Sequence, residues 1–193
     1  MDYASLSLAE VRAGLENVAH DVQQTFGSLD TRQLNWRPDA SHWSVAQCFE
    51  HLLATNRMMS QAGDDALSGR APKTIWHRLP FWPRLFGPLI VRSQAPEATR
   101  KYKTSAEASP ASSDIGPDII QRFIEQNRQL IARLQTLDER AAADAIMTSP
   151  FARVVTYTVL DGWRVLFTHD RRHIEQARRV MQSAGFPAPR PVT

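Results

Sequence analysis

Residues 158–184 read TVLDGWRVLFTHDRRHIEQARRVMQSA, and this stretch decides the fold class. Its apolar residues recur at steps of three and four, which is the period of a helix with one buried face. Thr158 and Asp161 offer a capping box at the start, and Gly185 offers a stop just beyond the end. At about 1.5 Å per residue the predicted helix is roughly 40 Å long, enough to line a whole helical bundle.

Three further segments carry the same helical period, at residues 7–26, 44–68 and 117–137. Residues 29–42 read as a loop with proline-containing turn chemistry. No segment shows a strand period of comparable strength. We therefore predict an all-α protein, a four-helix bundle that forms a single domain over residues 1–193.

The segment between the second and third predicted helices, residues 69–116, differs in character. It is rich in proline and also holds Trp76, Phe81, Trp82 and Phe86. A flexible linker would not carry so many aromatic residues. We expect short helical pieces and loops over the bundle, where these aromatic residues either wall a substrate pocket or simply pack.

Composition and charge exclude several classes of protein. The 193 residues are 42% hydrophobic and 22% charged, which is ordinary for one globular domain. The net charge of +3 comes from scattered arginines, so nucleic-acid binding is not expected. No apolar stretch is long enough to span a membrane, and no secretory signal is visible. Because Cys48 is the single cysteine, no internal disulfide can form, and a cytoplasmic location is expected.

Three histidines form the candidate site. His169 and His173 are four residues apart, so both imidazoles lie on one helix face. They interrupt a core-like stripe, and polar groups in a core need partners. His51 lies on the apolar side of the second predicted helix and can meet them if the two helices face each other. We predict that the three bind one divalent metal ion with open coordination positions; the alternative is that they are satisfied core histidines.

Other candidate ligands have plainer interpretations. His20, His42 and His77 have no partner at ligand spacing, and we do not expect them to bind metal. Cys48, three residues before His51, either points toward the metal or is a small buried hydrophobe. We do not count it as a ligand.

The remaining polar and aromatic residues near the histidines are less informative. Trp43 and Trp163 are expected in the core. Glu50 and Asp170 flank the ligands in sequence but should point to other faces, so no general base is apparent. Four arginines of the last helix either guide an anionic substrate or form a solvated face; these are Arg171, Arg172, Arg178 and Arg179.

Two motifs resemble signatures of the DinB/YfiT-like superfamily. Residues 43–52, WSVAQCFEHL, preceded by NWRP at 35–38, are similar to its second-helix signature. Residues 169–176, HDRRHIEQ, are similar to its last-helix signature, and Tyr102-Lys103-Thr104 followed by Pro110 resembles a loop of one branch. The resemblance covers nearly the whole chain.

This resemblance implies an up-down-down-up four-helix bundle with a three-histidine metal site, here His51, His169 and His173. It implies nickel or zinc as the metal, with iron or manganese as alternatives. Relatives include maleylpyruvate isomerases and S-transferases that use a low-molecular-weight thiol, so it also implies a small-molecule substrate, and dimers are common. The chain has Gln47 where the signature often has glutamate, which removes a carboxylate about one turn from His51.

Three functions follow from the residues and the resemblance. The first is a metal-dependent thiol S-transferase or a related isomerase, in which the metal lowers the pKa of a cofactor thiol. The second is metal-dependent hydrolysis at the same ligands. The third is a non-enzymatic, stress-related protein that binds a metal or another ligand.

Overall fold

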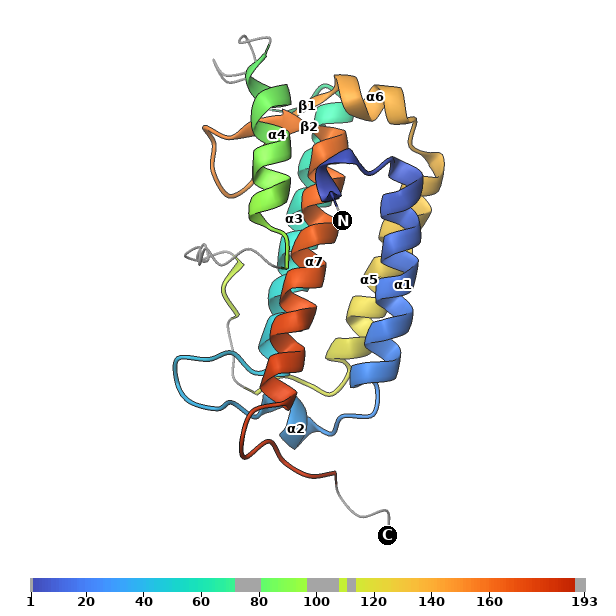
Figure 1. Ribbon diagram of the computed structural model, residues 1–193. Coiled ribbons are helices and arrows are strands. Elements are labelled where there is room, and N and C mark those ends of the chain that lie inside the picture. Colours follow the sequence, from blue (N-terminus) through green and yellow to red (C-terminus); the bar gives the residue numbers. More distant parts are fainter. Residues whose placement is uncertain (1, 72–80, 97–107, 111–113, 190–193) are drawn as a thin grey trace.

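The computed structural model describes residues 2–71, 81–96, 108–110 and 114–189. Four long helices form a bundle, and shorter elements cover its two ends (Figure 1). The elements in chain order are the 3-10 helix η1 (Tyr3–Ser5), α1 (Leu8–Phe26), α2 (Thr31–Asn35), α3 (Val45–Leu67), α4 (Trp82–Ser93), α5 (Ile119–Thr136), α6 (Glu139–Asp144), β1 (Ile146–Thr148), β2 (Thr156–Thr158) and α7 (Val159–Met181).

The predicted helical bundle and its up-down-down-up order are confirmed. Helices α1 and α7 run in one direction along the bundle, and α3 and α5 run in the other (Figure 1). Helix α3 packs most extensively against α7, and α1 packs most extensively against α5. The two helices that carry the predicted ligands, α3 and α7, are therefore direct neighbours.

The core at the centre of the bundle is apolar and aromatic. The Phe49 ring meets the rings of Phe26 and Phe123 edge to face, each with a centroid separation of 5.1 Å. Such pairs stabilise a core by about 0.5–1.5 kcal/mol beyond the burial of their area. Helix α3 begins with a capping box, since Ser44 and Gln47 exchange hydrogen bonds of 3.0 and 3.1 Å.

The structure corrects two expectations about local elements. Residues 29–42 are not all loop, because they contain the short helix α2, which begins with a capping box between Asp30 and Gln33. The last helix ends at Met181 rather than near residue 184, and Gly185 lies in the following turn with a φ of +86°. The small antiparallel sheet pairs Met147 with Tyr157 and leaves the bundle as the dominant feature. In the part of the chain that the structure describes, no helix is long and apolar enough to cross a membrane.

The 69–116 segment contributes one well-formed helix, α4, which packs against α7, β2 and η1. With 12 residues, α4 is longer than the short helical pieces that we expected in this segment. Trp76, His77 and the Tyr102–Thr104 motif lie outside the described residues, so the expectations about them are not tested.

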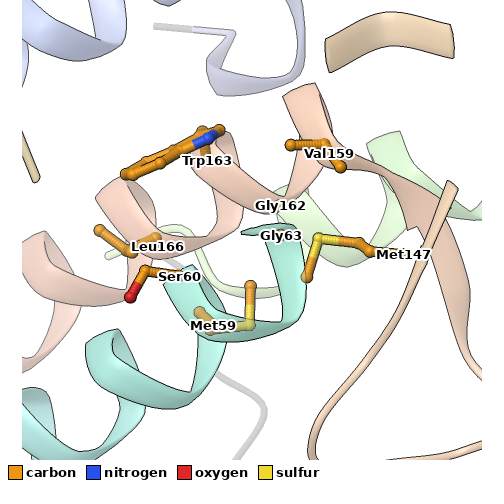
Figure 2. Close-up of a pocket in the computed structure, with 8 residues that line it drawn as sticks. All are labelled: Met59, Ser60, Gly63, Met147, Val159, Gly162, Trp163 and Leu166. Carbon is orange, nitrogen blue, oxygen red and sulfur yellow. The ribbon is translucent and has the colours of Figure 1, made fainter. Parts of the chain in front are cut away.

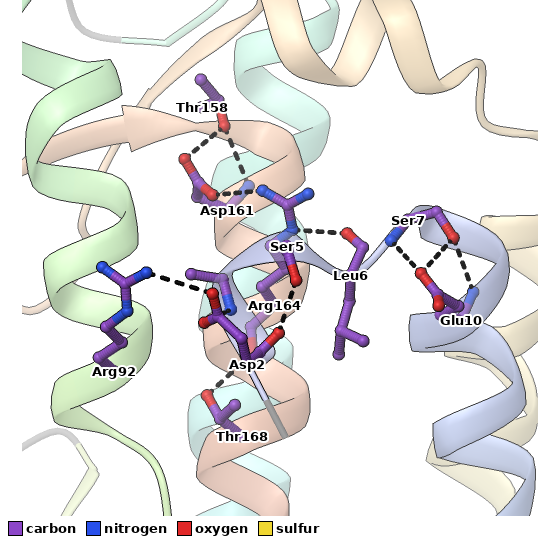
Figure 3. Close-up of polar contacts among 11 residues, drawn as sticks. Asp2, Ser5, Leu6, Ser7, Glu10, Arg92, Thr158, Asp161, Arg164 and Thr168 are labelled. Atoms are coloured by element: carbon purple, nitrogen blue, oxygen red, sulfur yellow. Dashed lines mark hydrogen bonds and ion pairs between the residues drawn. The ribbon is translucent and has the colours of Figure 1, made fainter.

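The start of α7 is held by a buried polar network (Figure 3). Thr158 caps the helix by accepting the backbone N–H of Asp161, and its hydroxyl donates to the Asp161 carboxylate at 2.9 Å. Arg164 forms an ion pair with Asp161 at 2.9 Å and donates to the Leu6 carbonyl at 2.6 Å. Helix α4 approaches this network closely, because a Cβ built on Gly87 would lie 2.1 Å from the Asp161 carboxylate.

A small apolar gap lies where α3, α7 and β1 meet (Figure 2). Met59 and Gly63 of α3 line it on one side, and Gly162 and Leu166 of α7 line it on the other. A Cβ added to Gly63 would meet only Val159, at an ordinary contact distance of 3.8 Å. The gap can therefore accept the methyl group of an alanine at position 63.

Gly63 and Gly87 should respond oppositely to substitution by alanine. We expect Gly63→Ala to raise the free energy of unfolding by about 0.5–1 kcal/mol, because alanine restricts the unfolded chain and fits the gap. We expect Gly87→Ala to lower it by about 1–3 kcal/mol, because Asp161 is fixed by its own partners and cannot yield. Urea unfolding measures both values. Equal effects in the two variants would contradict the close packing of α4 on α7.

Candidate metal centre

The packing of α3 against α7 brings the three predicted histidines together. His51 comes from the middle of α3, and His169 and His173 come from successive turns of α7. One ring nitrogen of each lies within 4.8 Å of the other two. The ring centroids are separated by 5.0 Å (His51–His169), 4.6 Å (His51–His173) and 4.5 Å (His169–His173). The sequence-based grouping of these residues is therefore matched by their positions in space.

One hydrogen bond fixes the orientation and tautomer of His51. Its Nδ1 lies 2.6 Å from the carbonyl oxygen of Ala108, which can only accept, so Nδ1 carries the proton. The unprotonated Nε2 then points toward Nε2 of His169 at 3.2 Å. A tetrahedral zinc ion with bonds of 2.0–2.1 Å holds its nitrogen ligands about 3.3 Å apart. The spacing of these two nitrogens therefore fits a shared ion.

The protein environment keeps all three imidazoles in the neutral form that binds metals. Burial lowers the pKa of His51, and burial with the adjacent rings lowers that of His169 well below its usual range. Burial lowers the pKa of His173 to about 3. Nδ1 of His173 is buried and has no hydrogen-bond partner among the described residues. A metal ion would satisfy an unpaired, buried, neutral ring nitrogen of this kind.

No carboxylate or thiolate joins the cluster among the described residues. Cys48 is fully buried, and burial raises the pKa of its thiol to about 12, which fits a small buried hydrophobe. Gln47 is tied to Ser44 at the start of α3. Three nitrogen ligands would leave coordination positions open, as in catalytic rather than structural zinc sites.

Trp43 packs against the hydrophobic core, as expected, and it also walls the cluster. The side chain is half-buried, and its ring lies 5.9 Å from His173 in a nearly parallel stack of 25°. The ring centroid is also 5.0 Å from that of His51. Trp163 is buried as expected, but it lines the gap in Figure 2 rather than the histidine cluster.

A buried pair beside the cluster was not singled out from the sequence. Asn56 of α3 donates from Nδ2 to both carboxylate oxygens of Asp170, at 3.0 and 3.3 Å. Asp170 is completely buried, and burial raises its pKa to about 8 against the opposing effect of Asn56. The available signal was an asparagine at helical spacing within the apolar stripe of α3. As expected, Asp170 engages a partner other than the histidine cluster.

Most of the candidate arginines have structural partners. Arg178 pairs with Asp21 and Glu175, and Arg172 donates to the carbonyl oxygen of Ser93 at 3.0 Å. Arg171 lies over the rings of Tyr3 and Phe167, at 5.9 and 6.0 Å from their centroids. Arg179 is exposed, and its positive charge contributes to the lowered pKa of His173. Arg172 and Arg179 are therefore the two candidate arginines whose charges act on the cluster.

The histidines that we set aside lie apart from the cluster, as far as the structure describes them. His42 is exposed and pairs with Asp39 at 2.8 Å, and His20 is exposed on α1. Neither belongs to the group of residues whose ligand atoms converge.

Comparisons with known proteins agree with this architecture. The sequence model of the DinB superfamily matches residues 14–177, a range that includes all three histidines. The fold is similar to that of YfiT from Bacillus subtilis, with a TM-score of 0.56 and 17% identity over 95% of this chain and 92% of that one. That protein is described as a probable metal-dependent hydrolase with an unusual four-helix bundle topology. No curated protein sequence gives a significant match.

The raised pKa of Asp170 predicts a pH dependence of stability. In the folded protein this carboxyl keeps its proton up to about pH 8, whereas its usual pKa is 3.8, so stability falls as pH rises through this window. Between pH 6.5 and 8, Asp170 alone should lower the unfolding free energy of the metal-free protein by about 1.5 kcal/mol. The three histidines act in the opposite direction, because their folded pKa values are lowered and the unfolded chain still releases protons from histidine just above pH 6.5.

Urea unfolding in the presence of a chelator tests this dependence. The contribution of Asp170 is the difference in unfolding free energy between wild type and Asp170→Asn, because the histidine contribution is common to both, and this difference should fall by about 1.5 kcal/mol from pH 6.5 to 8. Asp144→Asn, which changes an exposed carboxylate, should behave as wild type. A difference between wild type and Asp170→Asn that does not change between pH 6.5 and 8 would refute the protonated state of Asp170.

Proposed function

Because the chain belongs to the DinB superfamily, we propose that His51, His169 and His173 bind one divalent metal ion in a metal-dependent enzyme. The observation that carries this proposal is the convergence of three neutral imidazole nitrogens within 4.8 Å, with no charged ligand in the described cluster. Such a donor set suits nickel or zinc, and it also admits iron or manganese.

When bound, such an ion lowers the pKa of a coordinated thiol or water molecule and polarises a carbonyl group. The protein's own residues position and shield the site. Ala108 holds the ring of His51, and the Trp43 ring covers one side of the cluster. His169 and His173 remain partly exposed to solvent, which gives a small-molecule substrate access.

Within this class we favour a thiol-dependent S-transferase or isomerase. No carboxylate of the described residues belongs to the cluster, and the Asp170 carboxylate accepts a hydrogen bond from Asn56. A thiol can lose its proton to solvent when it coordinates the metal, and the thiolate then attacks an electrophile. Hydrolysis of an amide or ester is helped by a group that protonates the leaving atom. With no carboxylate in the described cluster and Asp170 engaged by Asn56, this requirement favours the thiol reaction.

Metal-dependent hydrolysis is the second candidate. It is favoured by the structural similarity to YfiT, which is described as a probable metal-dependent hydrolase. The same three histidines would serve as ligands. A non-enzymatic protein that only binds a metal is the third candidate, and it would not offer the ion's open positions to a thiol or a substrate.

Metal content tests the site itself. We expect about one first-row ion per chain in untagged wild type, and its loss in His51→Ala or His169→Ala, because two nitrogen ligands hold an ion far more weakly than three. His20→Ala and His42→Ala, which change histidines outside the cluster, should retain the ion. Elemental analysis after loading with zinc or nickel gives the stoichiometry, and full occupancy in both cluster variants would refute the site.

The absorption spectrum of the cobalt-substituted protein separates the candidate reactions. We expect a low-molecular-weight thiol to add a sulfur-to-cobalt charge-transfer band in the near ultraviolet, because the open position accepts a thiolate. His20→Ala should give the same band, whereas His173→Ala should not. Turnover of ester or amide substrates, with no thiol-induced band, would favour hydrolysis. A spectrum unaffected by either ligand would favour the non-enzymatic role.

A further inference from the structure

A groove of about 410 Å³ lies between α1 and α7. The two helices are neighbours in the bundle (Figure 1), but α1 packs less extensively on α7 than on α5. Pockets that bind small molecules commonly have volumes of about 300–1,000 Å³, and in helical bundles they lie between helices. None of the three histidines of the candidate metal centre lines this groove. It is therefore a separate cavity, and its lining indicates what it can hold.

The contact between Gly14 and Phe167 sets the alignment of the two walls. A Cβ added to Gly14 would lie 2.4 Å from the Phe167 ring, so the two helices approach closely at this point. From there α1 and α7 run in the same direction (Figure 1). Asn17 lies three residues further along α1, and Arg171 lies four residues further along α7, which is about one turn in each helix. Both line the groove, so a ligand can contact them from the same position.

The floor of the groove is apolar. Leu6, Val18, Phe167 and Ile174 are buried in the core and line the groove with part of their surface. Water over such a floor is released when an apolar ligand covers it, and this release favours binding. The floor therefore fits a ligand with an apolar body.

The acidic side chains along the groove already have partners. Arg178 pairs with both Asp21 and Glu175. Glu10 accepts hydrogen bonds from the backbone N–H and the hydroxyl of Ser7, each at 2.8 Å (Figure 3). A cationic ligand would have to compete with these contacts. The acidic groups would also repel a doubly charged anion such as a phosphate.

Arg171 carries the charge that remains available to a ligand. Its guanidinium carbon lies 5.9 and 6.0 Å from the ring centroids of Tyr3 and Phe167. Contacts with aromatic rings position a guanidinium without neutralising its charge. Among the described residues no carboxylate forms an ion pair with Arg171. A guanidinium presents its N–H donors as a planar fork that matches a carboxylate.

We propose that the groove between α1 and α7 binds a small monocarboxylate with an apolar body, such as a medium-chain fatty acid anion. The carboxylate accepts hydrogen bonds from Arg171 on one wall and from the Asn17 amide on the other. The apolar body covers Val18 and Ile174. A single negative charge matches the one available guanidinium, and the volume fits a small molecule.

This site is independent of the candidate metal centre. His169 and His173 are each two positions beyond Phe167 and Arg171, which is about 200° around α7. The histidines and the groove therefore lie on opposite sides of one helix. The monocarboxylate site does not rest on the proposed function, and either can fail without the other.

Isothermal titration of octanoate into the full-length protein tests the groove. We expect one site per chain with a Kd of about 0.1–1 mM. Octylammonium, which has the same apolar chain and the opposite charge, should bind about tenfold more weakly or not at all. Arg171→Gln should weaken octanoate binding about 10- to 100-fold, and Arg171→Lys should weaken it less. Arg122→Gln, which removes the same charge from an exposed position of α5, should bind as wild type does.

Two further variants locate the bound octanoate. Ala13→Phe fills the groove from an exposed position of α1 and should abolish binding without changing the charge. His173→Ala, on the other side of α7, should retain it. Amide shifts in a nitrogen–proton correlation spectrum should change at Asn17, Val18 and Arg171. Circular dichroism and the melting temperature should show that each variant is folded.

Four results would overturn the proposal. The first is no binding at about 10 mM octanoate, and the second is equal binding of octanoate and octylammonium. The third is an unchanged octanoate affinity in folded Arg171→Gln. The fourth is binding that is lost in His173→Ala and kept in Arg171→Gln, since this would place the carboxylate on a metal ion at the histidine cluster.

Discussion

The packing of α3 against α7 is the contact on which the rest of the site depends. It is the most extensive helix pair in the bundle, and it runs between helices that are far apart in the chain. It places His51 against His169 and His173, and it buries the hydrogen bonds between Asn56 and Asp170. The apolar part of this contact supplies the stability, because burying polar groups costs free energy unless they find partners.

The same burial gives the candidate site its chemistry. Imidazoles in a water-poor environment lose their protons at pH values where free histidine would keep them, and the unprotonated ring is the metal ligand. In the described residues, no carboxylate balances a positive ion at the cluster. The site thus resembles open three-histidine centres, in which a neutral ligand set leaves most of the ion's charge to act on a bound molecule. Burial therefore links the stability of the bundle to the reactivity of the proposed centre.

The 69–116 segment has two roles that its composition alone did not show. Its Ala108 carbonyl fixes the tautomer of His51, so a residue outside the bundle helices sets the orientation of a candidate metal ligand. Its helix α4 rests on the start of α7 through Gly87 and turns an apolar stripe outward. A single insertion thereby contributes both to the site and to the packing at the start of α7.

The sequence by itself determined the four long helices and the placing of His169 and His173 on one helix face, because helical period and a four-residue spacing are local properties. That His51 lies against them depends on the packing of α3 on α7. It also carried an overlooked local signal, the Asp30–Gln33 capping box of α2. Only the tertiary structure decided that Trp43 walls the site, that Asn56 partners Asp170 and that Ala108 orients His51. These contacts join residues on separate elements, and their formation depends on how whole helices and loops pack, which no local pattern specifies.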